Sequence, residues 1–211
     1  AGDSNVFSDG KSFFHVQIGT ASVGGTLITF DDLDIDGTLT VNNGGTTSLS
    51  IADDTMYIGG DLNFTNLESF TSSNSTVVFD GFNTVFGFSS GGHAFDNVKF
   101  DNAAIWYSLD DMVVEGTMAV AAGFLAGSVD ITVNGGHVTG NGTIAMTNAG
   151  TFTVDGTGNF GGDAEWVFYN LRLGDGVGAA TTSAIGSAKV VMASVLTVST
   201  ACSSGIVALK I

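Results

Sequence analysis

The sequence predicts an all-β chain wound as a parallel β-solenoid (β-helix) that forms a single domain over residues 1–211. Val, Thr and Phe are frequent and favour strands, while the 31 glycines, with many Asn and Asp residues, favour turns. The chain contains no proline, as expected where almost every backbone N–H pairs with a neighbouring rung. A rung takes roughly 20–25 residues, so the chain provides about nine rungs.

Similar segments recur in the same order along the chain, which is typical of a repeat architecture. FFHVQI at 13–18, FDNVKF at 95–100 and FYNLRL at 168–173 share an aromatic residue followed by alternating apolar positions. Their offsets are 82 (95 − 13) and 73 (168 − 95). We therefore expect three degenerate repeats, which cover roughly residues 1–73, 74–148 and 149–211.

If these repeats stack, equivalent side chains form columns along the solenoid. One expected column consists of Gln17, Lys99 and Arg172, and another of His15, Asn97 and Asn170. Short strands broken by GG, NG, DG or GN recur throughout, and no stretch of 11 residues has helical periodicity. A Greek-key β-sandwich also uses short strands and frequent turns and is the alternative fold. Internal repetition favours the solenoid.

The charge of the chain restricts its partners. Five Lys and Arg residues face 21 carboxylates, which gives a formal net charge of −16. Without a basic patch to neutralise phosphates, nucleic acid is not expected as a partner. The longest apolar run, Met118 to Ala126, is far shorter than the ~20 residues that span a bilayer, so no membrane insertion is expected.

The sequence also carries signs of an extracellular location. It begins with the small, polar AGDSN rather than with Met, which is typical of a chain from which a signal peptide has been removed, or of a fragment boundary. The single cysteine, Cys202, has no intrachain disulfide partner and is expected to be a small core residue or an intermolecular link.

The stretch from Thr76 to Val120, which contains TVVFDGFNTV, HAFDNVKF and LDDMVVEGTMAV, resembles a secreted bacterial and archaeal surface repeat. That family typically runs TVTFDG, FYNLTI and DLTVNGTLTI. Thr151 to Val198 is also similar, and Val6 to Val41 more loosely so. The resemblance implies a right-handed β-solenoid of the kind found in adhesins, surface-layer-associated proteins and large exoproteins. It implies an architecture rather than an activity.

Catalytic motifs are not apparent. The three histidines are scattered, no Gly-x-Ser-x-Gly elbow has a matching Asp and His, and no phosphate-binding loop is present. In the pairs Asp53-Asp54 and Asp110-Asp111, neighbouring strand residues point to opposite faces, so neither is a natural acid/base pair. We expect a protein that is not an enzyme, with a polysaccharide-active β-helix enzyme as the third functional reading.

The strongest cluster of charged residues is DDLDIDG at 31–37. Strand alternation places Asp32, Asp34 and Asp36 on one face and Leu33 with Ile35 on the other. Three carboxylates about 7 Å apart repel one another, and Ca²⁺ would relieve that repulsion. The first interpretation of the cluster is a solvated acidic face that prevents edge association, and a calcium site at Asp32, Asp34 and Asp36 is the alternative. No other cofactor is expected.

Glycans enter the predictions in two ways. Asn63, Asn74 and Asn141 begin Asn-x-Ser/Thr sequons and are candidate glycosylation sites. Phe13, Phe95 and Phe168 occupy the first position of the repeated segments. These aromatic rings are expected in the core or in a ladder, or alternatively on the surface as a sugar-binding row.

Neither terminus has an amphipathic helix that could cap an open solenoid end. Both termini instead read as strands, so identical subunits are expected to stack head-to-tail or to donate a terminal strand. The residues assigned to assembly are Val6, Phe7, Ile206, Val207, Ala208, Leu209 and Ile211. The sequence thus predicts a structural subunit of an extracellular filament or surface fibre, whose partner is itself. A cell-surface adhesin that binds glycans is the second reading.

Overall fold

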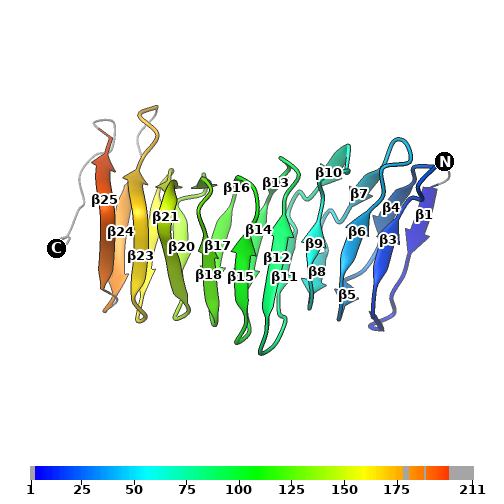
Figure 1. Cartoon of the computed structure of the whole chain (residues 1–211), viewed down its shortest axis with the longest axis horizontal. Helices are drawn as coiled ribbons and strands as arrows, with labels where there is room; N and C mark the ends of the chain where they lie inside the picture. Colours follow the sequence, from blue (N-terminus) through cyan, green and yellow to red (C-terminus); the bar gives the residue numbers. More distant parts are fainter. Residues whose placement is uncertain (1–2, 178–180, 188, 200–211) are drawn as a thin grey trace.

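The protein is a β-solenoid, as a computed structural model that describes residues 3–177, 181–187 and 189–199 shows. Successive turns stack along one axis, from the N-terminal turn to the C-terminal turn (Figure 1). Every strand pair among the described residues is parallel, as in β11 (Thr76–Phe79) with β14 (Asn97–Phe100). A Greek-key sandwich consists of antiparallel sheets, so that alternative is wrong. No helix occurs in the described parts of the chain, and therefore none there could span a membrane.

Each turn contributes one strand to each of three faces. Face A contains β1 (Asp3–Val6), β4 (Thr26–Thr29), β7 (Ser48–Ser50), β10 (Ser69–Thr71), β13 (Ala94–Phe95), β16 (Met112–Val114), β19 (Ile131–Val133) and the later halves of β21, β23 and β25. Face B contains β2 (Ser12–Phe13), β5 (Leu33–Ile35), β8 (Thr55–Ile58), β11, β14, β17 (Thr117–Val120), β20 (His137–Thr139), β22 (Gly158–Gly162) and β24 (Thr182–Gly186). Face C contains β3 (Val16–Ile18), β6 (Leu39–Val41), β9 (Leu62–Asn63), β12 (Val85–Ser89), β15 (Ile105–Ser108), β18 (Phe124–Gly127) and the first halves of β21 (Thr143–Val154), β23 (Trp166–Leu173) and β25 (Val190–Val198).

The solenoid has nine turns, because face B is a 9-stranded sheet. The residues that pair between adjacent turns are as close as 19 positions in sequence, for Ile105 and Phe124, and as far apart as 26, for Leu62 and Phe88. The predicted rung length and number of rungs are therefore confirmed. The longest spacing spans the loop 80–84, which bulges between β11 and β12.

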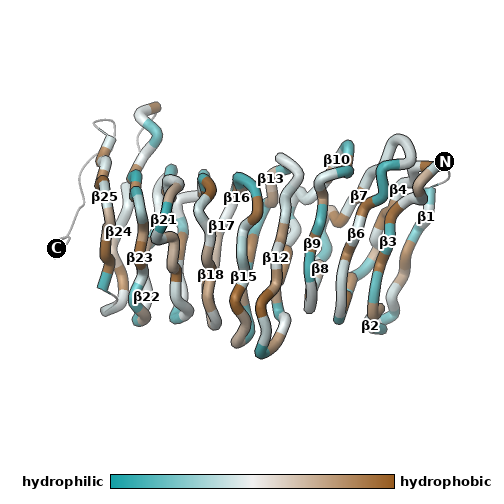
Figure 2. Tube along the Cα trace, viewed as in Figure 1, coloured by the Kyte–Doolittle hydropathy of each residue, from teal (hydrophilic) through white to brown (hydrophobic). Residues whose placement is uncertain are grey.

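Alternation of inward and outward side chains builds the core. Phe79 and Phe100 occupy adjacent turns of face B, and their rings stack with centroids 4.9 Å apart. Trp106 of face C closes this layer, with its ring centroid 4.9 Å from that of Phe79. The hydrophobic segments recur along the strands of successive turns (Figure 2). Stacking like side chains every ~4.8 Å thus gives one continuous apolar core along the axis.

The repeated segments found in the sequence do not stack on one another, so the expected columns are wrong. Residues 13–18 connect face B to face C, residues 95–100 connect face A to face B, and residues 168–173 connect face C to face A. Each offset therefore corresponds to three and two-thirds turns rather than a whole number. Lys99 pairs with Val78 and Ala119 of neighbouring turns, not with Gln17 or Arg172.

The three segments are nevertheless equivalent as corners of the solenoid. At each corner a polar side chain bonds to the backbone of an adjacent turn: Asn97 Oδ1 accepts from the Thr117 N–H at 2.9 Å. His15 Nδ1 accepts from the Thr38 N–H at 2.9 Å, and Asn170 Nδ2 donates to the Gly150 carbonyl at 3.2 Å. The repetition in the sequence reflects a shared requirement at corners, where the backbone leaves the sheet ladder and needs other partners.

Candidate functional site

Pairs of aspartates join consecutive turns at the corner between faces C and A. The Asp110 carboxylate accepts hydrogen bonds from the N–H groups of Ser90 and Gly91, both at 2.8 Å, and from the Ser89 hydroxyl at 2.7 Å. The next carboxylate, Asp111, accepts from the Asp130 N–H at 2.9 Å in the following turn. One member of the pair thus bonds to the previous turn and the other to the next, which gives the pair a structural role.

A similar arrangement joins the first three turns at the corner between faces A and B. Asp31 accepts from the N–H groups of Ser8 at 2.7 Å and Asp9 at 2.8 Å, while Asp32 accepts from the Thr55 N–H at 2.8 Å. The hydrogen bond from the Ser8 N–H is the main reason why the pKa of Asp31 lies below its usual value. Asp32 thus bonds to the neighbouring turn through one of its carboxylate oxygens.

The three carboxylates of the predicted calcium site do project outward while Leu33 and Ile35 are buried. Asp36 accepts a hydrogen bond from the Ser12 hydroxyl at 2.8 Å. Asp34 is half-buried, and this burial, followed by the charge of Asp36, raises its pKa. In the described ranges, no group of three or more His, Cys, Asp or Glu side chains has a geometry that could hold a metal ion. The calcium site stays a prediction.

Face B carries an acidic cluster that the sequence did not reveal. Desolvation raises the pKa of Asp80, and the charges of Asp34, Asp36 and Asp101 add to the effect. Residues 36, 59, 80 and 101 succeed one another in adjacent turns at one corner, since the N–H of each of the last three bonds to the strand of the turn before. The second of these residues is Gly59, so a position without a side chain separates Asp36 from Asp80. The signal was hidden because these aspartates are far apart in sequence.

The sequon asparagines are all exposed. Each also has a local hydrogen bond: Asn63 Oδ1 accepts from the Thr65 N–H at 2.9 Å, and Asn74 Nδ2 donates to Asp53 at 3.0 Å. Asn141 Oδ1 accepts from the Asp163 N–H at 3.2 Å in the next turn. A glycan at any of them would meet solvent, and only at Asn74 does the amide nitrogen that would carry it already donate a hydrogen bond. Glycosylation at these sites stays a prediction.

The three aromatic residues that begin the repeated segments do not form a row for sugar binding. Phe95 and Phe168 are fully buried, with 0% of their surface exposed, and Phe13 is 37% exposed. They also lie on three different faces. The core interpretation holds for Phe95 and Phe168, and the sugar-binding alternative for this set is wrong.

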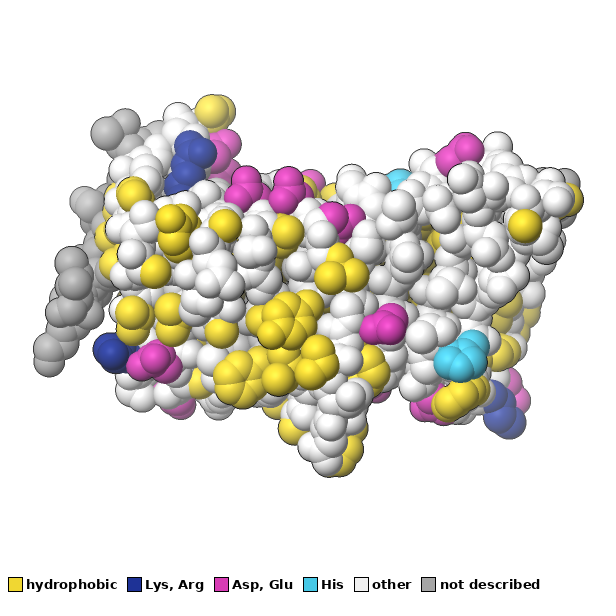
Figure 3. Space-filling model, in the orientation of Figure 1, with side chains coloured by type: hydrophobic (Ala, Val, Ile, Leu, Met, Phe, Trp, Pro, Cys, Tyr) yellow, Lys and Arg dark blue, Asp and Glu magenta, His cyan; other side chains and the backbone are white. Residues whose placement is uncertain are grey.

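Exposed aromatic and aliphatic side chains gather elsewhere, on face C. Figure 3 shows a group of hydrophobic side chains over the middle of the molecule, where β12, β15 and β18 lie. We call this group the apolar strip, and it consists of Val85, Ile105, Tyr107, Leu109, Phe124, Ala145, Val167 and Val191. The exposed fractions of its most prominent members are 65% for Leu109, 46% for Phe124 and 44% for Tyr107. In these strands of face C, the alternate residues that point outward are apolar. This pattern was present in the sequence but was not recognised there.

The N-terminal end of the solenoid is the first candidate assembly surface. β1, β2 and β3 are the terminal strands of their sheets, so one edge of each has no strand partner among the described residues. Phe7 is 68% exposed and stacks on Phe30 with ring centroids 4.9 Å apart, while Val6 packs against the core. The core of this turn is thus open to solvent at its edge.

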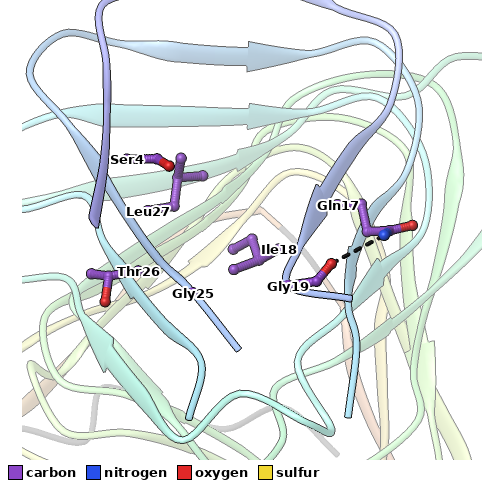
Figure 4. A pocket seen from close by; sticks show the side chains of 7 residues that line it. All are labelled: Ser4, Gln17, Ile18, Gly19, Gly25, Thr26 and Leu27. Carbon is purple, nitrogen blue, oxygen red and sulfur yellow. Dashed lines mark hydrogen bonds between the residues drawn. The ribbon is translucent and has the colours of Figure 1, made fainter. Parts of the chain in front are cut away.

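A small hollow opens beside this end, between faces A and C (Figure 4). Its lining residues are Ser4, Gln17, Ile18, Gly19, Gly25, Thr26 and Leu27. The Gln17 amide donates to the Gly19 carbonyl at 3.1 Å across its rim. No titratable side chain is among these lining residues, and the only side-chain hydroxyl groups among them belong to Ser4 and Thr26.

The C-terminal end is the second candidate assembly surface. β24 and β25 are the last strands of their sheets among the described residues, and Val195 and Ile185 are exposed there at 51% and 39%. The assembly residues Ile206, Val207, Ala208, Leu209 and Ile211 lie outside the described residues, as does Cys202.

No family model, curated protein or solved structure that we compared with the chain matches it.

Proposed function

We propose that the protein is a non-catalytic structural subunit of an extracellular filament or surface fibre, in which identical subunits stack head-to-tail. The observation that supports this most strongly is the match between the two ends of the solenoid. Among the described residues, the solenoid begins with β1, β2 and β3, one on each face, and ends with β24 on face B and the two halves of β25 on faces C and A. These strands all run in the same direction. A second copy can therefore continue the parallel ladders of the first.

The chemistry of the ends supports the same proposal. Exposed parallel edges normally carry charges or covers that block association. Here the exposed residues near the N-terminal end include Phe7, Phe14 and Phe30, and those near the C-terminal end include Ile185 and Val195. Burial of such residues in a heterologous contact contributes roughly 25 cal/mol for each Å² of apolar surface removed from water. Because the contact does not close on itself, it produces a filament rather than a ring.

The surface between the ends is suited to an extracellular structural role. The carboxylates are engaged in corner hydrogen bonds, as for Asp110, or project into solvent, as for Asp36. A net charge of −16 keeps the sides of separate filaments apart and makes their association sensitive to salt and divalent cations. Calcium bound near Asp32, Asp34 and Asp36 would add to this screening.

A charge placed on the end of the solenoid tests head-to-tail stacking. Val6→Asp puts a carboxylate at the edge of β1, where the second copy would pair, and is expected to abolish growth of the filament. Asn5→Asp is the matched control, because Asn5 is an exposed outward residue of the same strand. Polymerisation of Val6→Asp at the rate of the unmodified chain, measured by light scattering, would refute stacking through this edge.

A donated terminal strand is the second form of this proposal. Deletion of residues 205–211 is expected to abolish assembly if that segment completes the next subunit. Assembly that survives the deletion but not Val6→Asp favours direct stacking of the ends.

A glycan-binding adhesin is the alternative function, and the exposed rings of Tyr107 and Phe124 favour it. Aromatic rings of this kind can pack against the apolar faces of sugars. Saturable binding on a glycan array that is lost in Tyr107→Ala would support this alternative. A polysaccharide-active enzyme is the third functional reading. It would be supported only if the protein depolymerised a polysaccharide and if replacing Asp32, Asp34 and Asp36 together abolished that activity.

A further inference from the structure

We propose that successive copies in the filament are rotated by one face of the solenoid, about 120°, so that face A of each copy continues face B of the copy before it. This inference rests on the head-to-tail stacking proposed above and specifies how the two ends meet. Three features support it, namely the number of strand positions, the side chains at the two ends and the repeated corner segment.

The described residues do not form a whole number of turns. Face A has ten strand positions, from β1 to the later half of β25, whereas faces B and C have nine each. On face A, β10 and β13 share no ladder but are neighbours, because the Phe70 and Phe95 rings lie 5.7 Å apart and the Ser72 hydroxyl donates to the Ala94 carbonyl. The described solenoid therefore begins and ends on face A, one strand beyond nine complete turns.

This extra strand displaces the two ends relative to each other. A solenoid climbs by one strand spacing, ~4.8 Å, in each turn, so each end is a step rather than a plane. At the N-terminal end the step lies between faces C and A, because β1 comes first and β2 and β3 follow it along the axis (Figure 1). At the C-terminal end of the described residues the step lies between faces A and B, because β24 comes before the two halves of β25. The next strand position is thus on face B, over β24.

Rotation by one face brings the two steps into register. β1 of the second copy then lies on β24, β2 on the first half of β25, and β3 on its later half, each at one strand spacing. Without rotation, β1 would lie on the later half of β25, and β2 would be two strand spacings, ~9.6 Å, from β24. Backbone N–H and C=O groups of faces B and C would then lack partners at the junction. Direct stacking gives continuous ladders on all three faces only with the rotation.

The C-terminal end presents core positions that no further described strand covers. Val198 pairs with the buried Leu173, and Met192 pairs with the buried Phe168, so both continue inward positions. Leu196 continues a third inward position of face A. Val198 is nevertheless 38% exposed. These side chains require an apolar layer above them if the core is to continue into a second copy.

The N-terminal end supplies that layer in the rotated arrangement. Val16 and Ile18 of β3 pair with buried residues of β6 and therefore point inward, and rotation sets them on the later half of β25. Phe13 of β2, which is 37% exposed, comes over Met192. Without rotation, β1 would instead bring Ser4, which shares the inward register of β4 and β7, to this apolar end. Rotation thus places apolar residues on apolar residues.

The repeated segments of the sequence show that the corners are interchangeable. Residues 13–18, 95–100 and 168–173 are similar in sequence and form three different corners. A strand–corner–strand unit of one face is therefore compatible with the position of another. In the rotated arrangement, residues 13–18 of the second copy lie on β25, which itself pairs with residues 168–173. Two copies of the repeated segment then lie two turns apart at the same corner.

Helical reconstruction of filaments of the full chain by electron microscopy shows which faces adjoin at each junction. We expect face A of one copy next to face B of the preceding copy, a rotation of about 120°, so that every third subunit has the same orientation. Unrotated subunits would overturn the rotation and leave head-to-tail stacking intact. A rotation of about 240° would also overturn it, because a further strand would then lie between the copies. Absence of filaments would overturn both proposals.

Paired cysteines test the same contact in solution. Arg172 pairs with Thr197, and Gln17 is the equivalent of Arg172 in the repeated segment, so Gln17 of the second copy is expected beside Thr197. With Cys202→Ser as the background, the double variant Gln17→Cys, Thr197→Cys is expected to form a disulfide-linked ladder of multimers, because adjacent strands bring Cα atoms within disulfide range. Asn5→Cys, Thr197→Cys is the matched control, since Asn5 is an exposed outward residue of β1, which adjoins the later half of β25 only without rotation.

Light scattering checks that both double variants still assemble, and electrophoresis without reductant measures the linking. A ladder from the Gln17 pair with little linking from the Asn5 pair supports the rotation. Equal or stronger linking of the Asn5 pair would overturn it. Assembled filaments in which neither pair forms a ladder would also overturn it, because the ends would then meet in another way.

Discussion

Aspartate acts here chiefly as a ligand for the backbone of neighbouring turns. At a corner, the chain leaves one sheet before it enters the next, and its N–H groups lose their partners in the ladder. The Asp110 carboxylate accepts hydrogen bonds from two such N–H groups. The Asp31 carboxylate, in the second turn of the solenoid, does the same. The sequence displayed the Asp-Asp pairs but could not show their partners, which lie about 20 residues away.

The corner role of Asp110 leads to a stability prediction. Asp110→Ala leaves the Ser90 and Gly91 N–H groups without their acceptor and is expected to lower the free energy of unfolding by about 2–4 kcal/mol. Glu68→Ala is a suitable control because Glu68 is exposed and its carboxylate has no hydrogen bond in the described structure. Chemical denaturation measures both values, and equal stability of the two variants would contradict the assignment.

Asp80 should make the free energy of unfolding depend on pH. Its pKa is raised in the folded state, chiefly by desolvation, so the ionised form opposes folding. This carboxyl group favours the fold below its unfolded pKa of about 4, and that contribution is lost as the pH rises through the folded pKa. Asp80→Asn is therefore expected to raise the melting temperature at pH 7 and to have little effect at about pH 3.

The control for this prediction is Asp101→Asn. Asp101 belongs to the same acidic cluster, but its carboxylate is paired with Lys99 at 2.6 Å. Its removal should therefore give a smaller gain at pH 7, or a loss. If Asp80→Asn lowers the melting temperature at pH 7, then the ionised Asp80 carboxylate does not oppose folding, which contradicts the prediction.

At the scale of elements, the corners decide how closely the turns can stack. Gly116 and Gly135 lie in adjacent turns at the corner between faces A and B, and an added Cβ at Gly135 would collide with the Gly116 carbonyl oxygen. By contrast, the nearest atom to an added Cβ at Gly127 of β18 is the Ser108 carbonyl oxygen at 3.4 Å, an ordinary contact.

These two glycines give a matched pair of substitutions. Gly135→Ala is expected to destabilise the fold by about 1–3 kcal/mol, because the backbone of one turn must move away from the next. Gly127→Ala should be neutral or slightly stabilising, since a strand residue gains a side chain without a clash. Thermal unfolding compares the two, and an equal loss in both variants would show that the close approach at Gly135 has no special role.

The sequence was sufficient to predict that strands form and which of their side chains point into the core. It was not sufficient to predict how the repeats stack. Alternation correctly placed Leu33 and Ile35 in the core and Asp34 outside. The similar segments that begin at Phe13, Phe95 and Phe168 were expected to lie above one another, yet they occupy three corners. The three segments are similar in sequence because each of them forms a corner, and each triangular turn has three corners.

At the scale of the whole molecule, the apolar strip consists of residues that are far apart in the sequence and lie together only in the folded solenoid. Val85, Tyr107 and Val191 are separated by more than a hundred residues from first to last, and each looks unremarkable in its own strand. Only the register of the turns brings them onto one face.

Electron microscopy with fibre diffraction of the purified protein tests the central claim, head-to-tail assembly, most directly. Nine turns at a spacing of ~4.8 Å give an axial repeat of about 43 Å for each subunit. We predict unbranched filaments with that repeat and a strong reflection at ~4.8 Å along the filament axis, because the strands of all subunits stack in the same direction. Monodisperse particles of a single subunit at all salt concentrations, calcium concentrations and pH values would contradict the claim.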